Sequence, residues 1–203
     1  MSDAKVRLSQ KEMEIVANAE LILTKNAIIQ KVNLLLSGLQ EKQKKCLESF
    51  SMQLPPELSQ STPKISKGEN YKGLPYLILD YPRIFEQENI IAIRTMFWWG
   101  NFFSITLHLS GVYKKMMEEK IIASVSLLKE NGFYCCVNKE QWVHDFEKTN
   151  YLLVSDINKN FEKVISDSPF IKLATRLPLQ QWDDAEEILL HSFGQIVELL
   201  ADY

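Results

Sequence analysis

The fold of this chain is decided by residues 90–109, which read IIAIRTMFWWGNFFSITLHL. Two runs of β-branched and aromatic residues flank the dipeptide Gly100-Asn101. Such runs are typical of strands, and a two-residue loop with glycine at its first position suits a type II′ turn, whose twist matches the strands that it joins. The sequence therefore predicts an antiparallel β-hairpin.

The register of this hairpin follows if Gly100 and Asn101 form the whole loop, because each residue before the turn then has a fixed partner after it. Thr95 is expected opposite Thr106. One face of the hairpin would carry Ile93, Thr95, Phe97, Trp99, Phe102, Ser104, Thr106 and His108. The other would carry Ala92, Arg94, Met96, Trp98, Phe103, Ile105, Leu107 and Leu109, and we expect this more apolar face to meet the core.

The first of these faces mixes large aromatic rings with hydroxyls and an imidazole. Apolar walls with a few polar groups that orient a ligand are typical of a small-molecule site. We therefore mark Thr95, Trp99, Thr106 and His108 as candidate ligand-binding residues. The alternative is a plain solvated or helix-covered face, since aromatic cross-strand pairs stabilise a hairpin without any ligand.

Arg94 is the one charged residue on the face expected to meet the core. Burying a guanidinium without a partner is very costly, so an acidic partner is expected. Asp80, on the preceding strand, is the residue that we expect to pair with it. The alternative is that Arg94 is held ready for an anionic ligand, and it joins the candidate ligand-binding residues for that reason.

Amphipathic helices are expected on both sides of the strand region in the sequence. Apolar residues recur every seven positions near the N-terminus, at Leu8, Ile15, Ile22, Ile29 and Leu36. Ser9 and Glu12 have the spacing of a capping box, so a helix should begin there and run to about Phe50, as one helix or as two. The C-terminal stripe consists of Trp182, Ala185, Leu189, Phe193, Ile196 and Leu200.

These elements predict an α+β fold, in which an antiparallel β-sheet with a central Gly-Asn hairpin is covered by the N-terminal and C-terminal amphipathic helices. Residues 1–53 form the N-terminal helical region. Residues 54–73 are rich in Pro and Ser and are expected to be a linker or surface loop. Residues 74–203 form the α+β domain, with a first strand that Pro82 ends, and the three parts make one structural unit.

Composition excludes several classes of function. The net charge is −3 and the pI is about 5.7, whereas a nucleic-acid binder is usually basic, so no nucleic acid is expected. The most apolar stretches contain polar residues, and the N-terminus lacks the apolar core of a secretion signal, so neither a membrane span nor export is expected. The three cysteines include no Cys-x-x-Cys pair, which favours the reducing cytoplasm.

A search for catalytic motifs finds none in the sequence. Phosphate-binding glycine loops and a Gly-x-Ser-x-Gly elbow are absent. The three histidines lie far apart, without partners at metal-ligand spacing. The acidic cluster at residues 183–187 stands at a helix start, where the helix dipole favours negative charge. We therefore expect no catalytic residue, no metal ligand and no cofactor.

Three classes of function remain, in this order. The first is a non-catalytic cytosolic protein that acts through homo-oligomer or partner contacts of its N-terminal helix, with a homodimer as the simplest form. The second is a small-molecule binding protein with an aromatic pocket on the hairpin at residues 90–109. The third is an enzyme whose site is assembled from scattered residues, such as His108 with Arg94 and a carboxylate.

Overall fold

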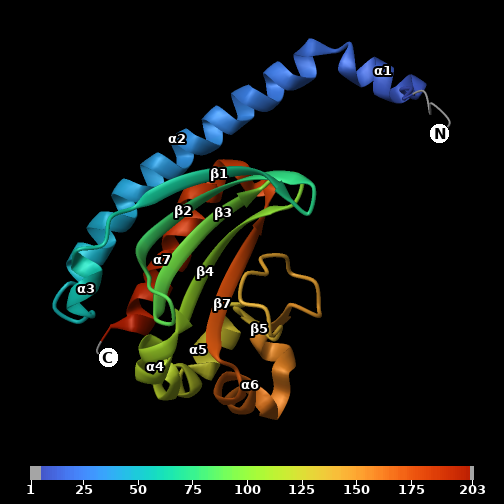
Figure 1. The fold of residues 1–203 in the computed structure, drawn as a ribbon. Coiled ribbons are helices and arrows are strands. Elements are labelled where there is room, and N and C mark those ends of the chain that lie inside the picture. Colours follow the sequence, from blue (N-terminus) through green and yellow to red (C-terminus); the bar gives the residue numbers. More distant parts are fainter. Residues whose placement is uncertain (1–5, 202–203) are drawn as a thin grey trace.

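The computed structural model describes residues 6–201, and within them seven strands form one antiparallel sheet in the order β1-β2-β3-β4-β7-β5-β6 (Figure 1). The strands are β1 (Lys64–Tyr71), β2 (Leu74–Phe85), β3 (Ile90–Trp98), β4 (Phe102–Ser110), β5 (Tyr134–Cys136), β6 (Tyr151–Leu153) and β7 (Phe170–Pro178). The predicted α+β class is confirmed.

Seven α-helices accompany the sheet within the same residues. They are α1 (Gln10–Val16), α2 (Ala19–Ser49), α3 (Pro56–Ser59), α4 (Gly111–Ala123), α5 (Val125–Glu130), α6 (Phe161–Asp167) and α7 (Ala185–Leu200), with 3₁₀ helices η1 (Val154–Asn160) and η2 (Leu179–Asp184). Figure 1 shows α7 behind the strands and α2 along the β1 side of the sheet. No helix of the described chain is long and apolar enough to cross a membrane.

The main core lies between one face of the sheet and helices α2, α4 and α7. Ile93 and Ile105 of the hairpin are fully buried there, as are Leu36 of α2 and Phe193 of α7. The predicted C-terminal stripe is confirmed, because Leu189, Phe193, Ile196 and Leu200 are buried in this core and Trp182 packs against it. Apolar side chains with a period of two on the strands therefore meet apolar stripes with a period of 3.6 on the helices.

The hairpin forms, but its predicted register is wrong by one residue. Trp98 pairs with Phe102 and Thr95 with Ile105, so the loop has three residues, Trp99 to Asn101. The backbone N–H of Asn101 donates to the carbonyl of Trp98 (3.1 Å), and Gly100 takes the positive φ of 71° that glycine adopts without strain.

The physical reason for this register is the division of polarity between the two faces. A slip of one residue moves every side chain of β4 to the opposite face. The observed register places the apolar residues of β4 beside those of β3, so that helices cover an almost wholly apolar surface: Ile91, Ile93, Phe97, Phe103, Ile105, Leu107 and Leu109. The expectation that Ala92, Arg94, Met96 and Trp98 of the first strand meet the core is therefore wrong, because the alternate residues of β3 face the helices instead.

One open alternative is resolved, and two boundaries differ from expectation. The N-terminal helix breaks at Ala17 and Asn18, because the Asn18 side chain accepts a hydrogen bond from the backbone N–H of Glu20 and starts α2 as an N-cap. Strand β2 continues past Pro82 to Phe85 through an irregularity in its pairing with β3. Residues 64–71, within the expected linker, form the edge strand β1, in which no residue is fully buried and the apolar signal is weak.

Candidate functional site

The second face of the sheet is polar, and a loop covers it in place of helices. This loop, residues 137–150 between β5 and β6, is called the strap below. The corrected register brings Arg94, Thr106 and His108 together on this face. The strap and the strands bury an unusual set of polar side chains, namely Asp80, Ser104, Thr106, His108, Asp145, Asn150 and Lys172.

The five candidate ligand-binding residues are therefore divided between the two faces. Thr95 lies on the helix-covered face, fully buried, where its hydroxyl accepts a hydrogen bond from Nε2 of Gln43 on α2 (3.3 Å). Trp99 lies in the hairpin loop and packs against the main core. Their expected association with Thr106 and His108 followed from the wrong register, so neither belongs to the polar face.

Arg94 forms the predicted pair with Asp80. Its Nε donates to Oδ1 of Asp80 (2.7 Å) and its Nη2 donates to Oδ2 (2.9 Å). This two-point geometry is the strongest that a guanidinium and a carboxylate adopt. A third nitrogen, Nη1, lies 3.2 Å from Nε2 of His144 in the strap.

The strap is held on the sheet by directed hydrogen bonds. Nζ of Lys172 on β7 donates to the carbonyls of Gln141 (2.9 Å) and Val143 (2.6 Å). Nε2 of His108 lies 3.1 Å from Oε1 of Gln141. The hydroxyl of Tyr71 donates to Asp145 (2.9 Å) and accepts from the backbone N–H of His144 (2.7 Å). Strands β1, β4 and β7 thus all contribute to its position.

The electrostatics of this face keep both histidines neutral. Burial, together with the nearby Lys172 and Arg94 cations, lowers the pKa of His108 to about 3. Burial and the same two cations hold the pKa of His144 well below its usual range. Burial also lowers the pKa of Lys172, to about 8. The constellation of His108, Arg94 and a carboxylate is therefore present on one face, but His108 bonds to an amide and Arg94 takes the carboxylate.

A cavity of about 280 Å³ lies between the polar face and the strap. It is lined by Ser66, Tyr71, Tyr76, Ile78, Arg94, Met96, Trp142 and His144. The strap residues were missed in the sequence because a loop has no periodicity to mark which of its side chains turn inward. The signal that the sequence offered was the presence of Trp142, Val143, His144 and Phe146 within an otherwise polar segment.

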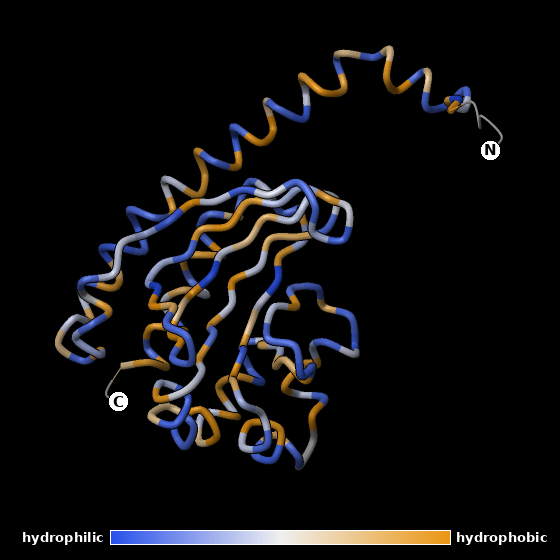
Figure 2. The backbone as a smooth tube through the Cα atoms, in the orientation of Figure 1, coloured by the Kyte–Doolittle hydropathy of each residue, from blue (hydrophilic) through white to orange (hydrophobic). Residues whose placement is uncertain are grey.

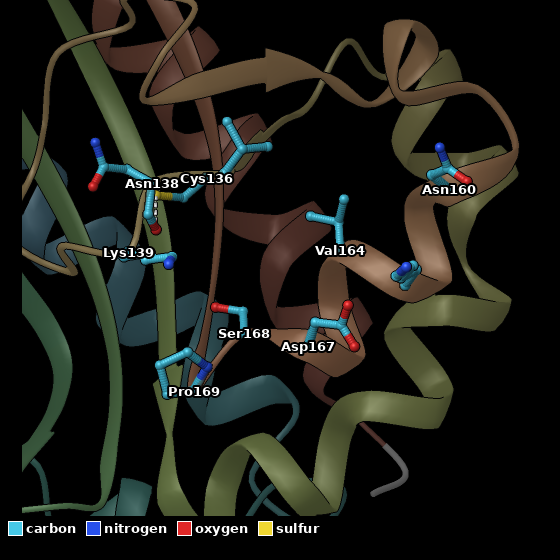
Figure 3. Close-up of a pocket in the computed structure, with 10 residues that line it drawn as sticks. Cys136, Asn138, Lys139, Asn160, Val164, Asp167, Ser168 and Pro169 are labelled. Carbon is cyan, nitrogen blue, oxygen red and sulfur yellow. Dashed lines mark hydrogen bonds between the residues drawn. The ribbon is translucent and has the colours of Figure 1, made fainter.

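A second hollow, of about 500 Å³, lies beside β5, η1 and α6 (Figure 3). Cys136, Asn138, Lys139, Asp167 and Ser168 are among its lining residues. The thiol of Cys136 is buried, and that burial raises its pKa, so it stays protonated and is a poor nucleophile at neutral pH. The adjacent thiols lie on opposite faces of the sheet, because Cys135 packs into the main core and Cys136 into a cluster on the polar face.

The N-terminal part of the chain is a third candidate, and residues 6–27 are called the arm below. In Figure 2 the arm extends beyond the sheet and carries repeated hydrophobic positions. Every residue of the arm is exposed except Lys25, which is intermediate and pairs with Glu69 of β1 (2.6 Å). The rest of α2 differs sharply, because Val32, Leu36, Leu39, Gln43 and Leu47 are buried.

The described residues contain no group of three or more His, Cys, Asp or Glu side chains that could hold a metal ion. Comparison with known proteins gives no further guide, because no family model, curated protein or solved structure matches the chain.

Proposed function

We propose that this protein acts without catalysis, as a cytosolic homodimer in which the arm of one copy packs against the arm of a second. The observation that carries this proposal is the set of eight large apolar side chains exposed on the arm: Val6, Leu8, Met13, Ile15, Val16, Leu21, Ile22 and Leu23. The cytosolic location is supported by the three free cysteines, two of them buried.

The apolar area of the arm fits a stable interface. Full burial of one such side chain stabilises by ~1.5–3 kcal/mol, which corresponds to roughly 60–120 Å² of apolar area. Eight side chains that are about half to fully exposed therefore offer roughly 500 Å². Because interfaces are only about 60% apolar, this amount implies roughly 800 Å² per partner, the size of a standard protein interface.

The charge of the arm favours a second copy over a strongly charged partner. Its basic and acidic side chains balance, with Arg7, Lys11 and Lys25 against Glu12, Glu14 and Glu20. A surface that binds nucleic acid or an anionic membrane carries an excess of basic residues. A neutral apolar helix, in contrast, meets another copy of itself without net repulsion.

The arm is also ordered before it meets a partner. Ser9 and Glu12 form the predicted capping box at the start of α1, and Asn18 caps α2. A helix that is already formed loses less conformational entropy on association than a disordered segment does.

The mass of the full-length protein in solution tests this proposal, measured by light scattering over a range of micromolar concentrations. We expect a dimer, and we expect the triple variant Ile15→Gln, Ile22→Gln, Leu23→Gln to be a folded monomer. The matched control replaces Met116 and Leu127, exposed apolar residues of α4 and α5, by Gln and should remain dimeric. A monomeric wild-type protein, or a triple variant that remains dimeric, would contradict the proposal.

Small-molecule binding is a second candidate function. The observation that favours it is the cavity beside Arg94 and His144, which brings a guanidinium, an imidazole and aromatic rings around one space.

A further inference from the structure

The cavity under the strap presents hydrogen-bond donors that the protein itself does not use. A guanidinium has five N–H groups. Each of the three nitrogens of Arg94 uses one N–H group within the protein: Nε and Nη2 donate to Asp80, and Nη1 donates to His144. One N–H on Nη1 and one on Nη2 therefore remain for another acceptor.

His144 supplies a further donor, and its tautomer follows from its partner. A guanidinium only donates, so Nε2 of His144 must accept the hydrogen bond from Arg94. Because the imidazole is neutral at pH 7, its single proton is then on Nδ1. No acceptor for this N–H is found within residues 6–201.

The other residues that line the cavity indicate which kind of ligand these donors would bind. No carboxylate side chain lines it, since Asp80 binds Arg94 from outside the lining set. Ser66 and Tyr76 add hydroxyls, and Ile78 and Met96 add an apolar floor. A donor-rich cavity with a cation, two aliphatic side chains and aromatic rings fits a molecule that has an anionic acceptor at one end and a small hydrocarbon body.

The size of the cavity limits that molecule. A volume of about 280 Å³ equals the liquid volume of roughly nine water molecules, at ~30 Å³ each. This space suits a ligand of about ten non-hydrogen atoms, which is smaller than a nucleotide.

We propose that the cavity binds a small monocarboxylate with an apolar body, its carboxylate against the free N–H groups of Arg94 and Nδ1 of His144. The apolar body contacts Ile78, Met96 and the rings of Tyr71 and Tyr76. Two N–H groups on neighbouring guanidinium nitrogens match the two oxygens of a carboxylate, and the side chains of Ile78 and Met96 suit its hydrocarbon body rather than the additional oxygens of a phosphate. This inference rests on the second candidate function and is independent of the arm.

Calorimetric titration of the full-length protein with sodium benzoate tests the proposal. Benzamide, which has the same shape without the charge, should bind at least about tenfold more weakly, and inorganic phosphate should not bind. Arg94→Lys keeps a cation beside Asp80 but removes the planar set of donors, so benzoate affinity should fall by about tenfold or more. The matched control is Arg83→Lys, on the same strand pair but outside the cavity lining, and it should bind as the wild type does.

A second variant guards against loss of folding at Arg94. Ser66→Leu fills the cavity from edge strand β1 and should abolish benzoate binding while circular dichroism and melting temperature stay unchanged. Its control is Lys67→Leu, the exposed neighbour outside the lining set.

Failure of benzoate to bind at millimolar concentration, equal affinity for benzamide, or phosphate binding at the same site would each overturn the proposal. Binding that survives both Ser66→Leu and Arg94→Lys would do so too. The mass measurements on the arm variants are separate from these titrations, so failure of one proposal is distinguishable from failure of the other.

Discussion

The two faces of the sheet are built from the same strands but are covered in different ways. On β3, Ile93, Thr95 and Phe97 point to helices α2 and α7, whereas Arg94 and the other alternate residues point to the strap. Helices offer continuous apolar stripes, and burial against them is non-directional. A loop has no such stripe, so the strap is held by hydrogen bonds of defined geometry from Lys172, Tyr71 and His108, together with an aromatic anchor, Phe146. The first face should therefore respond to lost volume, and the second to lost charge or changed protonation.

The largest effect is expected from removing volume on the helix-covered face. Leu189 of α7 is 2% exposed within the main core. Leu189→Ala should lower the free energy of unfolding by about 2–5 kcal/mol, through lost burial and the cavity that remains. Urea melts measure this change. The control is Leu34→Ala, because Leu34 is 73% exposed on α2 and should change stability by less than about 0.5 kcal/mol. Similar losses in both variants would show that burial does not distinguish these sites.

The helices that cover one face of the sheet were predictable from the sequence, whereas the polar face, and the side chains of β3 that meet the helices, were not. Periodicity identified the C-terminal stripe, the N-terminal helix and the hairpin, because burial against a helix leaves a repeating pattern of apolar residues. The strap leaves none, so its contacts at Trp142 and His144 could not be read from the sequence. The Arg94–Asp80 pair was predictable because a buried guanidinium requires an acid nearby.

The register error arose at a single loop residue. Gly100-Asn101 matches a two-residue turn, yet Trp99 also belongs to the loop and pairs with no residue of β4. Local turn chemistry favoured one register, and the separation of apolar from polar residues across two complete strands favoured the other. The separation of apolar from polar residues contributes the larger free energy, because a change of register moves every side chain of one strand to the other face.

The next largest loss of stability is expected from breaking the Arg94–Asp80 ion pair of the polar face. Arg94→Met removes the partner of the Asp80 carboxylate. Asp80 is buried, with 6% of its surface exposed. We expect the free energy of unfolding to fall by about 2–3 kcal/mol, less than for a fully buried pair because the Arg94 side chain is 18% exposed. Chemical denaturation measures the loss. Arg83→Met, at a partly exposed arginine whose Nε donates to a backbone carbonyl, is the control and should cost under about 1 kcal/mol. An equally small loss at Arg94 would contradict the assignment of this pair as structural.

A change of pH should weaken the polar face selectively. The pKa of His108 is about 3 in the folded protein, against an ordinary 6.5. Below pH 6.5 the unfolded chain therefore binds a proton that the folded chain does not, so stability falls as the pH falls from 6.5 towards about 3. The expected slope approaches about 1.4 kcal/mol per pH unit for one such histidine, and His144 adds to it in the same direction.

Thermal melts between pH 7 and pH 5 measure this dependence above the range in which most carboxylates titrate. His108→Gln should flatten the dependence, while Leu34→Ala, far from the polar face, should leave it unchanged. A wild-type protein with constant stability over this range would contradict the neutral, buried state of the histidines.

The smallest effect separates two threonines that differ only in the face on which they lie. Thr95 accepts the hydrogen bond of Gln43, whose other amide atom, Oε1, has no partner in the described structure. Thr95→Val should therefore cost about 1 kcal/mol, because it leaves a buried amide with no partner at either end. Thr106→Val, on the polar face, removes no side-chain hydrogen bond found in residues 6–201 and should change stability by less than about 0.5 kcal/mol. The double variant Gln43→Leu, Thr95→Val should recover most of the loss, since replacing both partners by apolar groups leaves nothing unsatisfied. If the two single variants lose equal stability, the threonine hydroxyls do not distinguish the two faces of the sheet. The energetic difference between the faces then comes from the charged groups alone.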